Sequence, residues 1–426
     1  MRILLAIKRV LKHPIVSTLG VFASANMIAT AMVGIAGVIQ ARWVSPEVLG
    51  EFHKYGILTG YLAIGLVVVQ DGLARQFPYL IGKGLKDEAI KVASVAKCWY
   101  VFVAGVSVLL FLVLTILSAL KGDMMAVAGW GTQSVVVVAG TYGVYLQTIY
   151  RRSMEFKRLS YNGLIASSLS FVLLVVVKFW GYFGLVIKTV VFNIVRVLLD
   201  ARYLPVKIRM TWDRACFVEL AKMSIPLSLE GYIRTSFMTA TFGFFVVKYC
   251  SPEDLGVYGI AAAFEGFAMI FVNSLVQIFD VKMANKFGEA ESMKNGFYAL
   301  VKPTVFGVCL SVVFAVILCL VIGPFISICV PHYVASIPVV YILSLALPIS
   351  ASIMPTRLLR VALMYKSIYA IAIMRVLVMV LCVHLVPRTV CWFAFCRVMS
   401  EAASVALGYV LLMVAIRREG ANYGSE

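Results

Sequence analysis

Twelve long apolar segments restrict the class of fold that this chain can adopt. A helix needs about 20 apolar residues to cross the ~30 Å hydrocarbon core of a bilayer. Segments near this length lie at 15–40, 55–80, 96–120, 124–150, 164–180, 182–204, 225–249, 255–279, 301–322, 333–354, 367–386 and 390–416. With 62% hydrophobic and 14% charged residues, the chain has too little polar surface for a water-soluble globule. We therefore predict an all-α polytopic membrane protein with about twelve transmembrane helices.

An octapeptide occurs twice, once in each half of the chain. Ser45–Phe52 reads S-P-E-V-L-G-E-F, and Ser251–Tyr258 reads S-P-E-D-L-G-V-Y, at an offset of 206 residues (251 − 45). Each copy follows one apolar segment and leads into another, so its environment is duplicated with it. We predict two six-helix bundles, residues 1–205 and 224–426, joined by a cytoplasmic linker at 206–223. Six helices return the chain to the same side, so the bundles would be parallel repeats.

The duplicated turn predicts specific roles for its prolines and glycines. Pro46 and Pro252 have φ preset near −65°, which suits the start of a turn or helix. Gly50 and Gly256 would allow another helix to approach closely. A second turn is expected at Phe179–Phe183, where aromatic rings favour the membrane interface between segments five and six.

Basic residues predict the orientation of the chain. If the N-terminus is cytoplasmic, 27 of the 38 basic residues fall on the cytoplasmic side, at most seven fall outside, and four lie within apolar segments. Both termini are therefore expected in the cytoplasm, and the first segment is expected to remain as an anchor because no cleavage site follows it. The net charge of +18 is explained by topology and requires no nucleic-acid partner.

Cysteine and histidine do not form metal-binding patterns. The nine cysteines are scattered singly, and the four histidines never occur at ligand spacing. We read the cysteines as small buried apolar residues and expect no metal and no cofactor.

Ionisable residues within apolar segments are costly and are therefore candidates for function. Asp71 and Arg75 are spaced i, i+4 in the second segment, where they can pair, although Arg75 could instead extend toward the interface. Arg234 lies near the bilayer midplane, one turn from Glu230. That pair is either a structural ion pair or the lining of an aqueous cleft.

The second half holds further candidates. Glu265 has no cation at i ± 3 or i ± 4, so it is either a site for proton or cation coupling or a buried neutral carboxyl. Arg375 has no acid close in sequence, whereas Arg397 and Glu401 are expected to pair at i, i+4. The 206-residue offset aligns Arg234 with Ile28 and Glu265 with Thr59, so the ionic groups are not duplicated.

Two six-helix halves with A-R-W-V-S-P-E-V-L-G-E-F and V-K-Y-C-S-P-E-D-L-G-V-Y turns resemble the Wzx-type polysaccharide flippases of the multidrug/oligosaccharidyl-lipid/polysaccharide (MOP) exporter superfamily. The turn is similar to that family's L-G-P-E-x-x-G-x-Y turn, with Ser45 and Ser251 where glycine is common. The resemblance covers the whole chain, and its motif is typical of the fold more than of the substrate.

The resemblance implies a carrier, not an enzyme, in the bacterial inner membrane. It implies that helices one, two, seven and eight line a cleft where internal arginines bind the diphosphate of a polyprenyl-linked glycan, such as an O-antigen or exopolysaccharide repeat unit. The candidate substrate-binding residues are Arg75, Arg234, Arg375, Asp71 and Glu230, and the candidate coupling residue is Glu265. Membrane lipid and a polysaccharide polymerase are the expected partners.

Three other functions are compatible with the same pattern. A cation-coupled multidrug exporter of the same superfamily would use Glu265 and Asp71. A membrane glycan polymerase or ligase would need a larger outer loop for its catalytic side chains. A non-catalytic scaffold or assembly partner is the third alternative.

Overall fold

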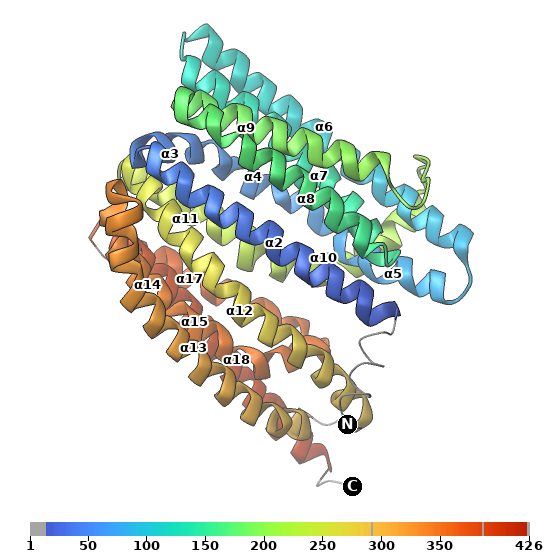
Figure 1. Cartoon of the computed structure of the whole chain (residues 1–426). Helices are drawn as coiled ribbons and strands as arrows, with labels where there is room; N and C mark the ends of the chain where they lie inside the picture. Colours follow the sequence, from blue (N-terminus) through green and yellow to red (C-terminus); the bar gives the residue numbers. More distant parts are fainter. Residues whose placement is uncertain (1–13, 291–292, 386, 424–426) are drawn as a thin grey trace, which may run out of the picture. The chain divides into compact units, whose positions relative to one another are not determined.

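The computed structural model describes residues 14–290, 293–385 and 387–423, and every regular element in these ranges is a helix (Figure 1). The all-α polytopic class is confirmed, and each of the twelve predicted segments is helical over most of its described length. In the described ranges, eight helical stretches are long and apolar enough to cross a membrane: Pro46–Gly82, Lys86–Leu120, Met124–Arg152, Leu174–Arg202, Met293–Cys329, Pro331–Ser352, Tyr365–Leu385 and Val390–Glu419.

The chain divides into two compact units. Unit 1 comprises Met1–Val44 and Tyr55–Tyr232, and unit 2 comprises Ser45–Lys54 and Ile233–Glu426. Unit 2 therefore contains both copies of the duplicated turn, and the chain passes from unit 1 to unit 2 in the middle of the seventh apolar segment. The six-helix bundles predicted from the sequence divide at the 206–223 linker instead, and that division stays a prediction.

Unit 1 packs its helices around one aromatic and aliphatic core. Leu73, Phe77, Tyr100 and Tyr145 are among its fully buried side chains. The elements of unit 1 are α2 (Pro14–Trp43), α4 (Gly56–Leu62), η1 (Ala63–Val68), α5 (Gln70–Gly82), α6 (Lys86–Leu120), α7 (Met124–Arg152), α8 (Phe156–Val172), α9 (Leu174–Arg202) and α10 (Arg214–Tyr232).

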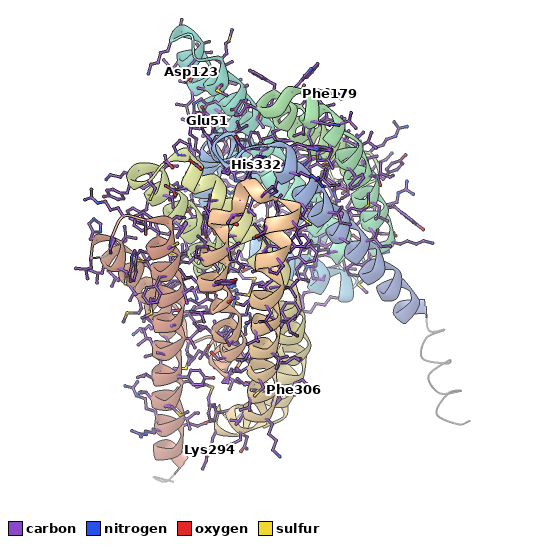
Figure 2. All side chains as sticks on the ribbon, turned by 60° about the vertical axis from the view of Figure 1, so that its left-hand side comes forward. Glu51, Asp123, Phe179, Lys294, Phe306 and His332 are labelled. Atoms are coloured by element: carbon purple, nitrogen blue, oxygen red, sulfur yellow. The ribbon has the colours of Figure 1, made fainter. Side chains whose placement is uncertain are left out.

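Unit 2 contains longer helices and several short helical turns. Its elements are α3 (Pro46–Lys54), η2 (Ile233–Phe237), α11 (Met238–Tyr249), α12 (Pro252–Ala290), α13 (Met293–Cys329), η3 (Pro331–Ser336), α14 (Ile337–Ser344), α15 (Ala346–Ser352), η4 (Met354–Arg357), α16 (Leu358–Val361), α17 (Tyr365–Leu385) and α18 (Val390–Tyr423). Figure 2 shows α13 running from Lys294 toward His332, with Phe306 between them. Phe306 is 60% exposed, as a lipid-facing side chain would be.

The predicted aromatic hairpin between segments five and six is confirmed. Gly181, at φ 49° and ψ −115°, interrupts α9, and this left-handed conformation favours glycine. The two arms then meet closely, because a Cβ on Gly184 would lie 2.5 Å from the Cα of Val177. Phe179 projects from this hairpin (Figure 2).

The segment predicted as a linker is helical in its second part. Residues 203–213 form the connection, and α10 begins at Arg214. The Asp213 carboxylate accepts a hydrogen bond from the backbone N–H of Cys216 (2.8 Å) and lies 2.6 Å from the Lys91 ammonium. These two contacts lower the pKa of Asp213 from its ordinary value. The linker is thus anchored to unit 1 at the start of α10.

The two copies of the turn contact each other reciprocally through glycine. Pro46 and Pro252 are the first residues of α3 and α12, as predicted. A Cβ on Gly50 would lie 1.6 Å from the carbonyl oxygen of Pro252, and one on Gly256 would lie 1.8 Å from that of Pro46. Each glycine therefore receives the backbone of the other copy, which confirms the predicted close approach.

The caps of the two turns differ. In the second copy the Ser251 hydroxyl accepts from the backbone N–H of Asp254 (3.1 Å), and the Asp254 carboxylate accepts from the backbone N–H of Ser251 (3.1 Å). This reciprocal pair is a capping box. The first copy has Val48 in place of Asp254 and keeps only a longer bond from the Val48 N–H to the Ser45 hydroxyl (3.4 Å).

We expect Gly50→Ala and Gly256→Ala each to destabilise the protein by about 3 kcal/mol, because the added methyl group must displace backbone instead of a flexible side chain. Gly266→Ala in α12 is the matched control, since its Cβ would meet nothing within 4 Å. Thermal unfolding in detergent measures the difference. Equal melting temperatures for all three variants would contradict the reciprocal contact.

Candidate functional site

The second apolar segment is a broken helix. It runs as α4, the 3₁₀ turn η1 and α5, with Val69 between η1 and α5 at φ −130° and ψ −11°. Such a break leaves backbone groups without helical partners, and inside a membrane they must be satisfied by protein. The break therefore depends on side chains from neighbouring helices.

Two neighbouring helices supply those side chains. The Trp99 indole N–H of α6 donates to the Gly65 carbonyl (2.8 Å). The Ser224 hydroxyl of α10 donates to the Val67 carbonyl (2.8 Å) and accepts from the Asp71 backbone N–H (3.1 Å). Ser224 is fully buried, so it joins the two sides of the break out of contact with solvent.

Further contacts hold α10 along the same segment. The Ser228 hydroxyl lies 3.3 Å from the Asp71 backbone N, and the Tyr232 hydroxyl donates to the Tyr61 carbonyl (3.0 Å). A Cβ on Gly72 would lie 2.7 Å from the Leu220 carbonyl oxygen, which shows how closely the two helices approach. The first part of segment seven is thus fixed to segment two.

The candidate residues of segment two do not form the predicted ion pair. Arg75 is exposed on α5, and among the described residues no ion pair joins it to Asp71. The sequence left two alternatives for Arg75, and its exposed side chain agrees with extension toward the interface. Asp71 lies in the first turn of α5, where an acidic side chain is favoured by the helix dipole.

Arg234 lies in an irregular turn of segment seven. Residues Ile233–Phe237 form the π-helical turn η2 between α10 and α11, and the Arg234 side chain is half-buried there. Glu230 is half-buried one turn earlier, in α10. π-turns inside helices often occur at functional sites because they redirect a side chain without ending the helix.

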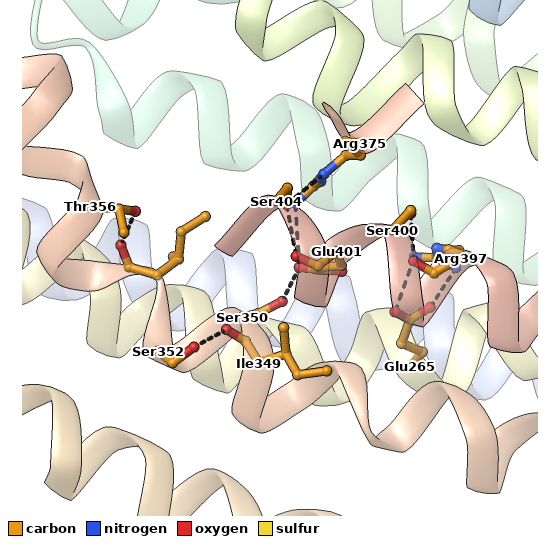
Figure 3. A network of polar contacts seen from close by, with 11 residues as sticks. Glu265, Ile349, Ser350, Ser352, Thr356, Arg375, Arg397, Ser400, Glu401 and Ser404 are labelled. Carbon is orange, nitrogen blue, oxygen red and sulfur yellow. Dashed lines mark hydrogen bonds and ion pairs between the residues drawn. The ribbon is translucent and has the colours of Figure 1, made fainter. Parts of the chain in front are cut away.

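The carboxylate of Glu265 has a partner that sequence spacing did not indicate. The Arg397 guanidinium of α18 donates to it through Nη2 at 3.0 Å, and Nη1 lies 2.8 Å from the other carboxylate oxygen as an ion pair (Figure 3). Nη1 donates to the Tyr258 hydroxyl at 2.6 Å. Glu265 is only 3% exposed. A hydrogen bond between ionised partners is stronger than one between neutral groups, so this buried contact is a strong one.

Arg375 of α17 belongs to a second buried polar group, in which Ser404 and Glu401 come from α18. Its guanidinium donates to the Ser404 hydroxyl at 3.2 Å and 3.0 Å and lies 3.9 Å from the Glu401 carboxylate. Glu401 in turn accepts from the Ser350 hydroxyl of α15 (2.5 Å). Figure 3 shows both groups along α18. The predicted Arg397–Glu401 pair was wrong, because each member contacts a different helix.

Unit 1 contains a buried carboxylate that sequence reasoning missed. Asp200 is fully buried in α9 and accepts from the Arg196 guanidinium (3.0 Å) and the Asn162 amide (2.9 Å). The Tyr150 hydroxyl donates to the Asp200 carbonyl (3.1 Å). The i, i+4 spacing of Arg196 and Asp200 was the available signal, but both stand at the end of an apolar segment where charges are expected.

Lys188 is a second missed residue within an apolar segment. Its ammonium donates to the Gln40 side-chain carbonyl of α2 (2.6 Å), which ties α9 to α2. Metal-ligand groups of three or more His, Cys, Asp or Glu side chains do not occur among the described residues.

Comparison with known proteins defines the family. A family model described as "Polysaccharide biosynthesis protein" matches residues 39–303, which are 265 of the 426 residues (303 − 39 + 1). The chain belongs to this polysaccharide biosynthesis family. No curated protein sequence matches it.

Solved structures show the fold of this polysaccharide biosynthesis protein. It is similar to a multidrug resistance MATE family transporter of the MOP superfamily in an inward-facing conformation, with a TM-score of 0.71, 15% identity, and coverage of 93% of this chain and 98% of that one. It is also similar to the lipid II flippase MurJ in an inward closed conformation, with a TM-score of 0.68, 13% identity, and coverage of 93% and 87%. The fold of the MOP superfamily is thereby confirmed.

We expect Ser224→Ala to destabilise the protein by about 2 kcal/mol, because it leaves the Val67 carbonyl and the Asp71 N–H short of partners within the membrane. Ser228→Ala, one turn further along α10, is the matched control and should cost less, since Asp71 keeps Ser224. Thermal unfolding compares the two. A larger loss for Ser228→Ala would show that Ser224 does not hold the break.

We expect a double-mutant cycle at Glu265 and Arg397 to show strong coupling. Arg397→Met alone leaves a buried carboxylate unpaired and should cost about 3–5 kcal/mol. The double variant Glu265→Gln/Arg397→Met should cost about 2 kcal/mol less than the sum of the single variants. Glu253→Gln, an exposed acid in the first turn of α12, is the control. Additive losses in the cycle would contradict a direct pair.

Proposed function

We propose that this protein is a flippase that moves a polyprenyl-diphosphate-linked oligosaccharide from the cytoplasmic to the outer leaflet of the bacterial inner membrane by alternating access. An O-antigen or exopolysaccharide repeat unit fits this description. The observation that carries the proposal is the combination of a polysaccharide biosynthesis family with a fold shared by MATE transporters and the lipid II flippase MurJ.

The lengths of the connections favour a carrier over a glycan polymerase or ligase. In the described ranges, the longest connection between helices is residues 203–213, on the side predicted to be cytoplasmic. No described connection on the other side is long enough to form a catalytic domain. An associated polymerase would then be a separate protein, and it remains part of the proposal.

Arg234 is the best-supported candidate for binding the diphosphate. Its half-buried side chain stands in a π-turn near the middle of segment seven. Arg375 is buried and held by Ser404 and Glu401. A planar guanidinium suits phosphate oxygens and keeps its charge when partly desolvated. The cleft lined by helices one, two, seven and eight stays a prediction.

The charge of the substrate supplies a driving force for outward movement. Fixed side chains return with the empty carrier, so only the substrate and any coupled ion cross the electric field. An anion of about −2 leaving a cell that is negative inside gains roughly 4–5 kcal/mol per 100 mV, at ~2.3 kcal/mol per charge. In the proposal, Glu265 resets the carrier by proton or sodium antiport, a step that would release Arg397 from its carboxylate.

We expect Arg234→Ala to reduce glycan export at least tenfold and Arg234→Lys to restore it only partly, because an ammonium cannot reproduce the two-bonded contact. The readout is lipid-linked glycan retained in the cytoplasmic leaflet. Arg209→Ala, an exposed residue of the 203–213 connection, is the matched control. Wild-type export by Arg234→Ala at normal expression would remove the phosphate-binding assignment.

The same experiment separates the alternatives. Loss of a polymerase leaves single repeat units already outside, so no cytoplasmic glycan would accumulate. Loss of a multidrug exporter changes drug sensitivity and leaves glycan export intact.

A further inference from the structure

A cluster of two cations and one aromatic ring lies beside the duplicated turn in unit 2. Lys248 and Tyr249 end α11, and Arg388 lies in the connection between α17 and α18. The Lys248 ammonium is 5.1 Å and the Arg388 guanidinium carbon 4.8 Å from the centroid of the Tyr249 ring. Two cations from different parts of unit 2 therefore converge on one ring.

A related arrangement, with one cation recorded on the ring, occurs in unit 1 at the equivalent position of the first repeat. Arg42 and Trp43 precede the first copy of the turn at the 206-residue offset (249 − 43). The Lys178 ammonium, from the hairpin between segments five and six, lies 5.7 Å from the Trp43 ring centroid. Arg388 comes from the corresponding connection of the second repeat. The residue types are thus repeated along with the turn, and one of the two cation–ring contacts is repeated with them.

The cations of the unit 2 cluster lack acidic partners in the described part of the chain. The charged groups of Lys248 and Arg388 are at most 9.9 Å apart (5.1 + 4.8), both side chains are exposed, and neither forms an ion pair with a described residue. Asp254, the acid of the nearby turn, accepts from Ser251 instead. The two positive charges repel each other, and an anion bound between them would offset this repulsion by attracting both.

The placement of these residues is unusual for a membrane protein. At most seven of the 38 basic residues are predicted on this side of the membrane. Four of those seven form the two clusters, and they are Arg42, Lys178, Lys248 and Arg388. Basic residues on this side oppose the predicted topology, so their repetition at equivalent positions points to a ligand.

Aromatic side chains around both clusters place them at the level of lipid headgroups. Phe179 and Trp180 are 73% and 62% exposed beside Lys178, and Phe244 lies 5.9 Å from the Lys248 ammonium. Exposed aromatic rings favour the interface, where lipid phosphates also lie. Ammonium and guanidinium groups both bind phosphate oxygens.

We propose that Lys248, Arg388 and the Tyr249 ring bind the phosphate of an anionic lipid in the outer leaflet, and that Arg42, Lys178 and Trp43 form the equivalent site of the first repeat. The Tyr249 ring contacts both cations of the second site. The phosphate comes from one of two sources, a phospholipid headgroup or the diphosphate of the glycan carrier after it has crossed. The second source rests on the proposed function, and the outer leaflet rests on the predicted orientation.

The test uses the full-length protein in neutral detergent, with bound lipids counted by native mass spectrometry. The probes are dioctanoyl phosphatidylglycerol and undecaprenyl diphosphate. We expect two tightly bound phosphatidylglycerol molecules on the wild type, one on Lys248→Gln/Arg388→Gln, and none when Arg42→Gln/Lys178→Gln is added. At about a factor of five per charge, each pair should weaken its own site about 20- to 30-fold.

Two controls separate a built site from general surface charge. Lys54→Gln/Lys121→Gln removes two other basic residues from the same predicted side and should retain both lipids. Tyr249→Leu keeps both cations and should weaken the second site severalfold, because the ring no longer positions them. Unchanged binding by Lys248→Gln/Arg388→Gln, or an equal loss in the Lys54/Lys121 control, would overturn the proposal.

The two probes identify the source of the phosphate. Loss of phosphatidylglycerol alone assigns the site to phospholipid, and loss of undecaprenyl diphosphate alone assigns it to the glycan carrier. Loss of both supports a shared phosphate site. The number of bound phosphatidylglycerol molecules does not depend on transport. The lipid-site proposal can therefore be supported even if the export assay contradicts the flippase proposal.

Discussion

The need to satisfy backbone groups inside the hydrocarbon core is the constraint on which this structure depends. Segment two breaks at Val69, and water is not available there to replace the lost helical bonds. Trp99 and Ser224 donate to the freed carbonyls of Gly65 and Val67. Because Ser224 comes from α10, the first part of segment seven has to remain with unit 1, and the chain enters unit 2 only at Ile233.

The sequence predicted what depends on local pattern. Length and hydrophobicity located the helical segments, and Gly181 lies in the hairpin that its aromatic neighbours indicated. The break at Val69 was missed because the apolar run continues through it without a proline, and its partner Ser224 is 157 residues from Val67. Glu265 and Arg397 are 132 residues apart, so rules limited to one helical turn paired Arg397 with Glu401 instead.

The reciprocal turn contact explains why one octapeptide is duplicated while its surroundings diverged. Gly50 receives the Pro252 carbonyl, and Gly256 receives that of Pro46. A side chain at either glycine would push the two turns apart and break both contacts, so neither copy can replace its glycine alone. The caps have no such reciprocal role, and the capping box of Ser251 and Asp254 has no counterpart at Val48. The close approach of the backbones therefore accounts for the glycine that both copies keep, whereas the carboxylate of the capping box occurs in only one copy.

The ion pairs inside the units are not duplicated, in contrast to the backbone contacts of the turns. The glycine contacts recur at equivalent positions, and so do the basic and aromatic residues beside them, whereas the Glu265–Arg397 pair aligns with Thr59 and Val191 and has no ionic equivalent. Thr59 instead donates to the Gln133 side chain (2.8 Å), a neutral contact between α4 and α7. Duplicated features lie at the ends of the segments, where both repeats meet the same interface. The charged residues that are not duplicated lie within the segments. A substrate without internal symmetry would contact each repeat differently, so it would require different side chains from the two repeats.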